Sequence, residues 1–547
     1  MHDWLHHRAR ATPESTALID ADETSSWSYS SLDRAVEEAA GRLRTLGVEP
    51  GDHVALLLPT NAAAAGLFHA GMRLGVVLVP LDDRLTAPEI EARLGRADVT
   101  LLVCSAESEQ TAIEAAGDVP VATIDDPQWE EVHPLPGTEE SPVDRHEWSL
   151  DDPLLILSTS GTTGEPKLVT LTVGNVLWSA IASGFRLGID PDDIWLDTLS
   201  FGHMGGIAPI YRSALYGTTL VLKSSFDPGA TADAIDEYDA TGISLVPTML
   251  VRMLESRGTL ADSLRVVLLG GAPASPELID RCRNFSIPVY PTYGMTETAS
   301  QIATARPKDA FEVPDSVGRP LMWVDVTIID EDGTPLEPGE RGEIVVDGPI
   351  VSPRYYDAPE TTAAAHCAYG LRTGDVGYFD ESGRLYVLNR LDDRITTGGK
   401  SVDPGEVGDV LTDHSGVTDA SVVGIPDSEW GERVAALVVR SDEELTGETL
   451  QSFARERLAG FKCPRFVLFA EELPRTVSGT VDRERVQDRL VAFADRVRET
   501  HGIPDAESDG VLVPEELLVG DERELQSDGD RSEESAETTD EAESDSQ

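Results

Sequence analysis

The sequence predicts an α/β protein with a large N-terminal domain, made of two layered α/β subdomains and a small β-barrel, and a smaller α+β C-terminal domain. From about residue 30 to 275, strand-length apolar runs such as 53–58 and 76–80 alternate with Ala-rich helical stretches such as 62–73. This alternation is typical of helices layered on largely parallel sheets. From about 317 to 390 the chain shows short strands separated by Asp-Gly and Ser-Gly turns, which favour the hairpins of a small barrel.

The remaining elements follow the same patterns along the chain. The layered part continues with apolar runs of strand length at 100–104, 154–157, 219–222, 244–247 and 266–270. The barrel strands are expected at 326–333, 342–349 and 377–388, each of which contains a glycine-bearing turn. After Arg390 the mixed α/β pattern returns for about 100 residues, which is enough for a separate small domain.

The 547 residues are too many for one hydrophobic core, since domains usually hold roughly 100–200 residues. We expect an N-terminal domain at 1–390, a C-terminal domain at 391–500 and an acidic tail at 501–547. Residues 505–547 contain 17 acidic and 2 basic residues, so the tail is predicted to be disordered apart from one short helix near 514–519.

The composition restricts the class of protein. A hydrophobic fraction of 40% with 26% charged residues is typical of a globular chain. No apolar run approaches the roughly 18 residues of a membrane span, and the first residues lack the apolar core of a signal peptide. We therefore expect no membrane span and a cytoplasmic location. The 4 cysteines have no metal-binding spacing, so neither a zinc site nor a disulfide framework is predicted.

The charge is strongly acidic. Lys and Arg number 43 against 99 Asp and Glu, for a net charge of −56, and only five of the cations are lysines. Such self-repulsion is costly at low salt and is screened at high salt. We interpret the chain as a cytosolic protein of a halophile, the alternative being an ordinary acidic protein. No basic stripe is present to bind phosphate backbones, so nucleic-acid binding is not expected.

A dense polar segment follows the apolar run 154–157. Glycines allow main-chain N–H groups to converge on one anion, and hydroxyls and a lysine add donors and charge. The spacing is not that of a Walker A loop, and a plain turn is the alternative. The candidate phosphate-binding residues are Ser158, Thr159, Ser160, Gly161, Thr162, Thr163, Gly164 and Lys167.

A second segment, at 290–302, places an aromatic residue, a glycine and a Thr-Glu pair after a short strand. Tyr293 can stack on a purine and Thr296 can donate to a phosphate. Glu297 offers a carboxylate to Mg²⁺, which usually takes few protein carboxylates together with phosphates. The alternative is a capped turn that starts a helix.

A third segment, at 371–378, is followed by 389–407. Asp375 on a tight glycine turn suits bidentate binding of the two ribose hydroxyls. Arg390 supplies a fixed cation near phosphate or ribose. Either residue alone could be a turn carboxylate or a surface arginine.

In this order and spacing, the three segments resemble the adenylate-forming superfamily of acyl-CoA ligases, luciferases and peptide-synthetase adenylation domains. The resemblance covers about residues 10–495, leaving out only the tail. Within the superfamily the chain looks most similar to the ligases that act on 2-succinylbenzoate in menaquinone biosynthesis. The segments that carry this finer resemblance are 174–180, 192–196, 212–217, 226–228 and 293–302.

The resemblance implies a reaction in two halves: a carboxylic acid attacks the α-phosphate of ATP to give acyl-AMP, and CoA thiol then displaces AMP. It implies that residues 158–167 hold the β- and γ-phosphates, that Thr296 touches the α-phosphate and that Glu297 binds Mg²⁺. Adenine would lie between Tyr293 and the segment Gly271, Ala272 and Pro273, with the ribose on Asp375 and Arg390.

The resemblance also implies moving parts and an acyl pocket. His203 would gate the acyl pocket, the alternative being a packed structural histidine. Asp392 would be the hinge of a mobile C-terminal domain, and Gly399 would line the tunnel for CoA. The second carboxylate of 2-succinylbenzoate needs a polar or basic partner. For this role we consider Ser300 and Gln301 first, and also Arg212 and Lys223.

The chain departs from the family at one position. The C-terminal Pro-Arg-Thr-x-x-Gly-Lys motif ends here in Thr480, so the lysine expected to bridge carboxylate and phosphate is missing. A cation of that kind contributes several kcal/mol in a water-excluded site. Another cation such as Arg475, Arg483 or a salt ion could serve instead. The protein could instead adenylate slowly yet adequately, or be a catalytically weak nucleotide-binding homologue. For the acyl substrate, the alternative is another aryl- or medium-chain acyl-CoA ligase.

Overall fold

The computed structural model describes residues 1–159, 167–397, 400–427, 430–442, 445–476, 480–501 and 518–521. The chain divides into two compact units. Met1–Thr373 and Gly377–Val387 form the first, and Gly374–Val376 and Leu388–Gln547 belong to the second. The main chain thus changes unit after Val387, three residues before the boundary expected from the sequence. In the described part of the chain, no helix combines the length and apolar character needed to cross a membrane.

An eight-stranded sheet forms one layer of the first unit, in the order β19-β9-β8-β4-β3-β5-β6-β7. Its central strands are buried on both faces: Leu56 packs into one core and Leu57 into another. This explains their continuous apolar sequence, which is typical of covered parallel strands. The strands are β3 (His53–Leu57), β4 (Val77–Leu81), β5 (Val99–Cys104), β6 (Val121–Thr123), β7 (His133–Pro134), β8 (Pro153–Thr159), β9 (Lys167–Thr172) and β19 (Arg354–Tyr355).

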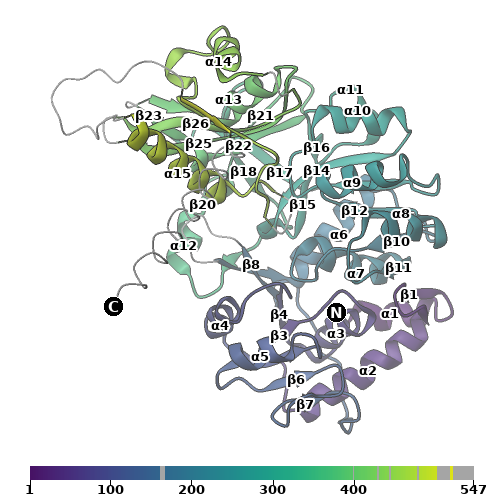
Figure 1. Cartoon of the computed structure of the whole chain (residues 1–547). Helices are drawn as coiled ribbons and strands as arrows, with labels where there is room; N and C mark the ends of the chain where they lie inside the picture. The colour runs from purple at the N-terminus through teal and green to yellow at the C-terminus, as the bar shows by residue number, and fades with distance from the viewer. Residues whose placement is uncertain are drawn as a thin grey trace, which may run out of the picture. The chain divides into compact units, whose positions relative to one another are not determined.

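Helices cover both faces of this sheet. One core contains α2 (Tyr29–Thr45) and α3 (Ala62–Leu74). The other contains α4 (Ala87–Arg96) and α5 (Glu109–Ala116), which lie next to each other in Figure 1. The α4 helix begins at Thr86 with a reciprocal capping box to Glu89, as the sequence rule for helix starts predicts.

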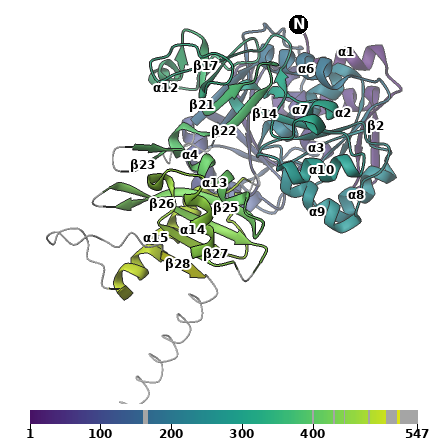
Figure 2. The same cartoon turned by 90° about the horizontal axis from the view of Figure 1, so that it is seen from above.

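A nine-stranded sheet forms the second layer, in the order β16-β15-β14-β13-β12-β10-β11-β1-β2. On one side α8 (Pro228–Glu237), α9 (Pro247–Arg257) and α10 (Pro276–Asn284) lie side by side (Figures 1 and 2). The other elements are α1 (Trp4–Ala11), α6 (Val173–Leu187), α7 (Met204–Tyr216) and α11 (Pro307–Glu312), with strands β1 (Thr16–Asp20), β2 (Ser25–Ser28), β10 (Ile194–Asp197), β11 (Thr219–Leu222), β12 (Gly242–Leu245), β13 (Val266–Leu269), β14 (Val289–Met295), β15 (Ser300–Thr304) and β16 (Arg319–Pro320).

The expected small barrel is an open half-barrel of five strands. The order is β17-β18-β21-β20, with β22 paired to β21. Its core includes Ile328, Ile344 and Val346. The elements are β17 (Asp325–Ile329), β18 (Gly342–Asp347), α12 (Pro359–Ala364), β20 (His366–Cys367), β21 (Gly370–Phe379) and β22 (Leu385–Arg390).

The second unit is built on a six-stranded sheet. Alternate residues of its central strands face opposite cores: Val422 packs with α13 and α14, and Val423 with α15. Figure 1 shows α15 on the opposite face of the sheet from α13 and α14. The elements are β23 (Ile395–Thr397), β24 (Lys400–Val402), α13 (Pro404–Thr412), β25 (Val417–Asp427), β26 (Gly431–Arg440), α14 (Gly447–Arg455), β27 (Phe466–Ala470), α15 (Arg483–His501) and β28 (Leu518–Asp521).

Four residues of the tail form a strand, contrary to the expectation that the tail is disordered apart from one helix. Leu518–Asp521 form β28, which pairs in parallel with β27, with Leu518 opposite Phe466. Neither disorder nor a helix describes these residues. Leu518 and Val519 extend the sheet at its edge, where an unpaired strand offers free hydrogen-bonding groups. The rest of the predicted disorder and helix lies outside the described residues.

Candidate active site

The predicted phosphate-binding segment begins at the end of β8 and ends at the start of β9. Strand β8 lies beside β4 in the sheet and pairs antiparallel with β9, with Thr159 opposite Lys167 and Ser158 opposite Leu168. The pairing therefore places a hydroxyl and a cation across from each other at this end of the two strands. Ser160, Gly161, Thr162, Thr163 and Gly164 lie outside the described residues.

Lys167 and Glu297 are brought together by a residue that the sequence analysis missed. The Lys167 Nζ lies 5.4 Å from the centre of the Tyr355 ring. The Tyr355 hydroxyl donates a hydrogen bond of 2.9 Å to Glu297 Oε1. Strand β19 holds Tyr355 against β9, opposite Val169. The two predicted segments therefore meet across Tyr355, although they lie in different sheets.

The Glu297 carboxylate is buried, and its Oε1 accepts the hydrogen bond from Tyr355. Glu297 is 7% exposed and lies in a short 3₁₀ turn, Thr296–Thr298. No cluster of three or more metal-binding side chains occurs among the described residues. Mg²⁺ is commonly held by one or two carboxylates plus substrate phosphates. A single carboxylate beside a lysine and a hydroxyl-bearing hairpin fits that mode of binding.

Gly294 fixes the hairpin that carries Tyr293, Thr296 and Glu297. A Cβ at position 294 would lie 1.6 Å from the carbonyl oxygen of Ser300, so only glycine permits this approach. The β14–β15 register shifts between Tyr293 and Gly294. Such a bulge re-aims side chains beside a functional site.

The predicted adenine segment follows the neighbouring strand. Gly271, Ala272 and Pro273 begin two residues after the end of β13 at Leu269, and β13 pairs in parallel with β14. Gly271 has φ +78°, a conformation that favours glycine. The loop and Tyr293 thus project from adjacent strands. Ligands of open α/β sheets bind at such carboxyl ends.

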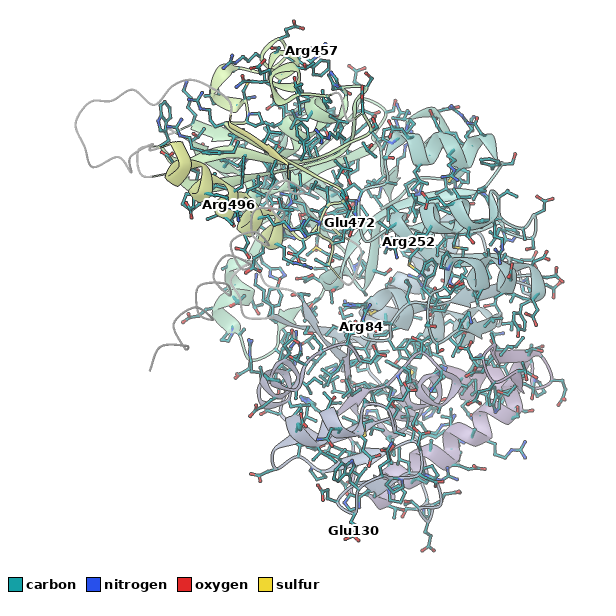
Figure 3. All side chains as sticks on the ribbon, in the orientation of Figure 1. Arg84, Glu130, Arg252, Arg457, Glu472 and Arg496 are labelled. Atoms are coloured by element: carbon teal, nitrogen blue, oxygen red, sulfur yellow. The ribbon has the colours of Figure 1, made fainter. Side chains whose placement is uncertain are left out.

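His203 is the residue before α7 and is paired with a carboxylate. Its Nε2 lies 3.2 Å from Asp82 Oδ2, and the imidazole is 51% exposed. Asp82 follows β4 and also accepts two hydrogen bonds from the guanidinium of Arg84 and one from its main-chain N–H; Figure 3 labels Arg84. Burial would raise the pKa of Asp82, but the hydrogen bonds from Arg84 and His203 hold it below its usual value. An imidazole that is exposed and paired with a carboxylate differs from a structural histidine, which would be packed in the core.

Arg212 is a buried cation in α7. It is 8% exposed, and its Nη2 lies 3.5 Å from Ser179 Oγ. No carboxylate of a described residue lies within ion-pairing distance. Burial lowers the pKa of its guanidinium. Ser179 Oγ in turn donates to the carbonyl oxygen of Ala299 at 2.9 Å, so Arg212 adjoins the β14–β15 hairpin.

The other residues considered for a second carboxylate are placed differently. Ser300 is partly buried at the start of β15. Gln301 is 1% exposed and donates to Thr304 Oγ1 at 2.9 Å. Lys223 is already paired with Asp22 at 2.9 Å. Of the four, Arg212 alone is a buried cation without a carboxylate partner among the described residues.

Two further predicted residues pair within the second unit. Asp375 lies in β21 and Arg390 ends β22, and Arg390 Nη1 lies 3.6 Å from Asp375 Oδ1. Asp392 is in the 3₁₀ turn Leu391–Asp393. Gly399 lies outside the described residues.

Thr480, at the position of the missing family lysine, is hydrogen-bonded to Thr476 in the second unit. The Thr480 carbonyl oxygen accepts from the Thr476 N–H at 2.8 Å. Both nearby arginines are in ion pairs. Arg475 contacts Asp419 Oδ2 at 2.8 Å, and Arg483 contacts Asp393.

The fold consists of two α/β layers, a half-barrel and a smaller unit. Together with the hydroxyls and lysine of the β8–β9 hairpin beside a buried carboxylate, this is the arrangement of an adenylate-forming enzyme. Residues 5–356 match the AMP-binding enzyme family, and residues 406–480 match the AMP-binding enzyme C-terminal domain. The chain belongs to the AMP-binding enzyme family.

Relatives of known name cover nearly the whole chain. The 2-succinylbenzoate–CoA ligase of Bacillus pumilus is 37% identical over 488 residues, which is 89% of this chain and 98% of the relative. The o-succinylbenzoate CoA synthetase of Bacillus subtilis, solved with the acyl-adenylate intermediate, is 34% identical with a TM-score of 0.81, covering 89% of this chain and 98% of that one. The same enzyme, solved with ATP and magnesium, is 35% identical with a TM-score of 0.80 and coverages of 90% and 99%.

Proposed function

We propose that the protein is an AMP-forming ligase that activates 2-succinylbenzoate with ATP and Mg²⁺ and transfers the acyl group to CoA in menaquinone biosynthesis. The names of the relatives support this substrate. The observation that carries the proposal is the buried guanidinium of Arg212, which has no carboxylate partner among the described residues.

Arg212 selects for a dicarboxylic acid. A buried cation without a counter-ion is costly, and the chain holds 99 acidic residues that could have supplied one. A carboxylate brought by the substrate would neutralise this charge. The link from Arg212 through Ser179 to Ala299 places it beside the hairpin of Glu297. One end of the acid could then meet Arg212 while the other end reacts.

The predicted nucleotide-binding residues have separate roles in this proposal. Ser158, Thr159 and Lys167 would bind the β- and γ-phosphates, and Glu297 would hold Mg²⁺. The substrate carboxylate attacks the α-phosphate beside Thr296, and pyrophosphate leaves. Bound Mg²⁺ would neutralise part of the negative charge on the phosphates.

The remaining predicted residues complete this scheme. Tyr293 and the segment 271–273 enclose adenine, and Asp375 and Arg390 hold the ribose. His203, oriented by Asp82, closes the acyl pocket. Rotation about Asp392 then admits CoA past Gly399, and its thiolate displaces AMP.

A substrate pair tests the role of Arg212. The wild type should favour 2-succinylbenzoate over 4-oxo-4-phenylbutanoate, which lacks the ring carboxylate. Arg212→Gln should lower kcat/KM for the dicarboxylate by roughly 100-fold, the value of a buried charge-assisted hydrogen bond. Its kcat/KM for the monocarboxylate should change little. Equal losses for both acids would contradict the assignment.

A second candidate is a nucleotide-binding homologue that adenylates weakly, and Thr480 is the observation that favours it. The two nearby arginines are already engaged with Asp419 and Asp393. The test is pyrophosphate release by Thr480→Lys in high salt. A large gain means that no substitute cation operates in the wild type, and an unchanged rate means that one does. Activity on other aryl or medium-chain acids alone would identify another acyl-CoA ligase.

We also propose that the protein works in the cytoplasm of a salt-accumulating cell. The support is the net charge of −56 with five lysines, together with substrates, ATP and CoA, that cells keep inside. Dilution from molar KCl into low salt should unfold the protein, because screening is lost. Unchanged circular dichroism and activity in low salt would contradict this.

A further inference from the structure

A second arginine without a carboxylate partner lies at the phosphate hairpin. Arg93 is in α4, and its Nε donates a hydrogen bond of 3.2 Å to Ser158 Oγ. Its Nη1 donates to the carbonyl oxygen of Glu89 at 2.6 Å. The two contacts hold Nε and Nη1, and Nη2 has no protein acceptor among the described residues.

The carboxylates of Glu89 and Asp82 lie close enough to Arg93 to favour its charge, but no described carboxylate forms an ion pair with it. The Glu89 carboxylate instead accepts from Thr86 N and Oγ1 at 2.8 and 2.7 Å. The Asp82 carboxylate is engaged by Arg84 and His203. Burial lowers the pKa of Arg93. In a chain of net charge −56, such a cation is an anion-binding group.

The position of Arg93 favours the phosphates of ATP, rather than the carboxylic acid substrate, as its ligand. Ser158 and Thr159 end β8, and Lys167 lies opposite Thr159 where β9 begins. Arg93 therefore approaches the hairpin through Ser158, on the strand across from the one that carries Lys167. Arg212, the candidate for the acid, is linked instead to the β14–β15 hairpin.

We propose that Arg93 is an additional phosphate-binding residue that donates to the β- or γ-phosphate of ATP, with Ser158 positioning its guanidinium. The inference rests on the proposed function. When the substrate carboxylate oxygen bonds to the α-phosphorus, the bond from that phosphorus to the bridging oxygen breaks. Its electron pair remains on pyrophosphate, and Arg93 stabilises the charge that develops there.

The test compares nucleotides with and without the outer phosphates. Binding of MgATP, AMP and inorganic pyrophosphate to the full-length protein is measured by calorimetry in high salt, with no acid present. Arg93→Gln should weaken MgATP and pyrophosphate roughly 10- to 100-fold, as expected for one charge-assisted hydrogen bond, and leave AMP unchanged. Arg93→Lys should recover part of the loss, since it keeps the charge but not the fork.

Controls separate this role from a structural one. Arg10→Gln removes the same charge from an exposed position in α1 and should leave all three affinities unchanged. Thermal unfolding reports whether each variant is folded, and Arg93→Lys keeps the test open if Arg93→Gln is not. Equal weakening of AMP and MgATP, or no weakening of either, would overturn the proposal. Because no acid is used, a wrong substrate assignment would not affect this result.

Discussion

Removal of the Tyr355 hydroxyl tests how Lys167 and Glu297 are joined. In Tyr355→Phe the ring beneath Lys167 is kept, but the 2.9 Å hydrogen bond to Glu297 Oε1 is lost. The carboxylate is 7% exposed, so water cannot easily replace the donor. Hydrogen bonds to charged groups contribute about 1.5–3 kcal/mol. We therefore expect kcat/KM for MgATP to fall roughly 10- to 100-fold, and the Mg²⁺ concentration for half-maximal rate to rise.

The neighbouring tyrosine supplies a matched control. The Tyr356 hydroxyl donates to Asp98 Oδ2 at 2.7 Å, but this carboxylate is exposed. Tyr356→Phe should therefore change stability and rate little, as is usual for exposed polar contacts. The assay is pyrophosphate release across a Mg²⁺ series, with thermal unfolding beside it. If Tyr355→Phe and Tyr356→Phe behave alike, Tyr355 does not position Glu297.

Three further variants have definite expected outcomes. Gly294→Ala should lower the free energy of unfolding by about 3 kcal/mol or more, because its Cβ would lie 1.6 Å from a main-chain oxygen. The control is Gly95→Ala, which has no neighbouring atom within 4 Å of the added Cβ and should not lower it. Urea unfolding measures both variants. Burial lowers the pKa of His69 to about 4. The unfolded chain therefore binds more protons between pH 6.5 and 4, and unfolding free energy should fall by about 3 kcal/mol as pH drops through that window. His69→Gln should remove this part of the acid sensitivity, and an unchanged pH profile would contradict the assignment. Asp82→Asn should lower kcat several-fold through loss of His203 orientation while the affinity for MgATP stays constant; a loss of MgATP affinity would argue against a role in the acyl pocket.

The layers of the fold could be predicted because the signals are local. The continuous apolar run of β4 and the Asp-Gly and Ser-Gly turns of the half-barrel each report on their own neighbourhood, and both predictions are confirmed. Short runs do not encode how a sheet ends, so the sequence could not show that the small barrel stays open as a half-barrel. The strand at Leu518–Asp521 was missed because its pairing partner, β27, lies some 50 residues earlier in the chain.

The candidate site could be predicted where motifs follow strands, and not where distant residues meet. Lys167 and Glu297 were found from hydroxyl, glycine and carboxylate patterns. Tyr355 was not, because its partner Glu297 is 58 residues away and a tyrosine in a short strand carries no anion-binding pattern. Arg93 and Asp82 were missed for the same reason. The periodicity of the sequence predicts the helix of Arg93 and the strand before Asp82. It does not predict which distant residues these two side chains contact.

Thioester formation across a panel of carboxylic acids distinguishes a 2-succinylbenzoate–CoA ligase from the alternatives in a single experiment. The full chain, kept in molar KCl, would be supplied with ATP, Mg²⁺, CoA and each acid, and the products identified by mass spectrometry. We expect a CoA thioester of 2-succinylbenzoate, formed with release of AMP and pyrophosphate, and little product from acids that lack the second carboxylate. Thioesters of monocarboxylic acids alone, or bound ATP without any thioester, would contradict this expectation.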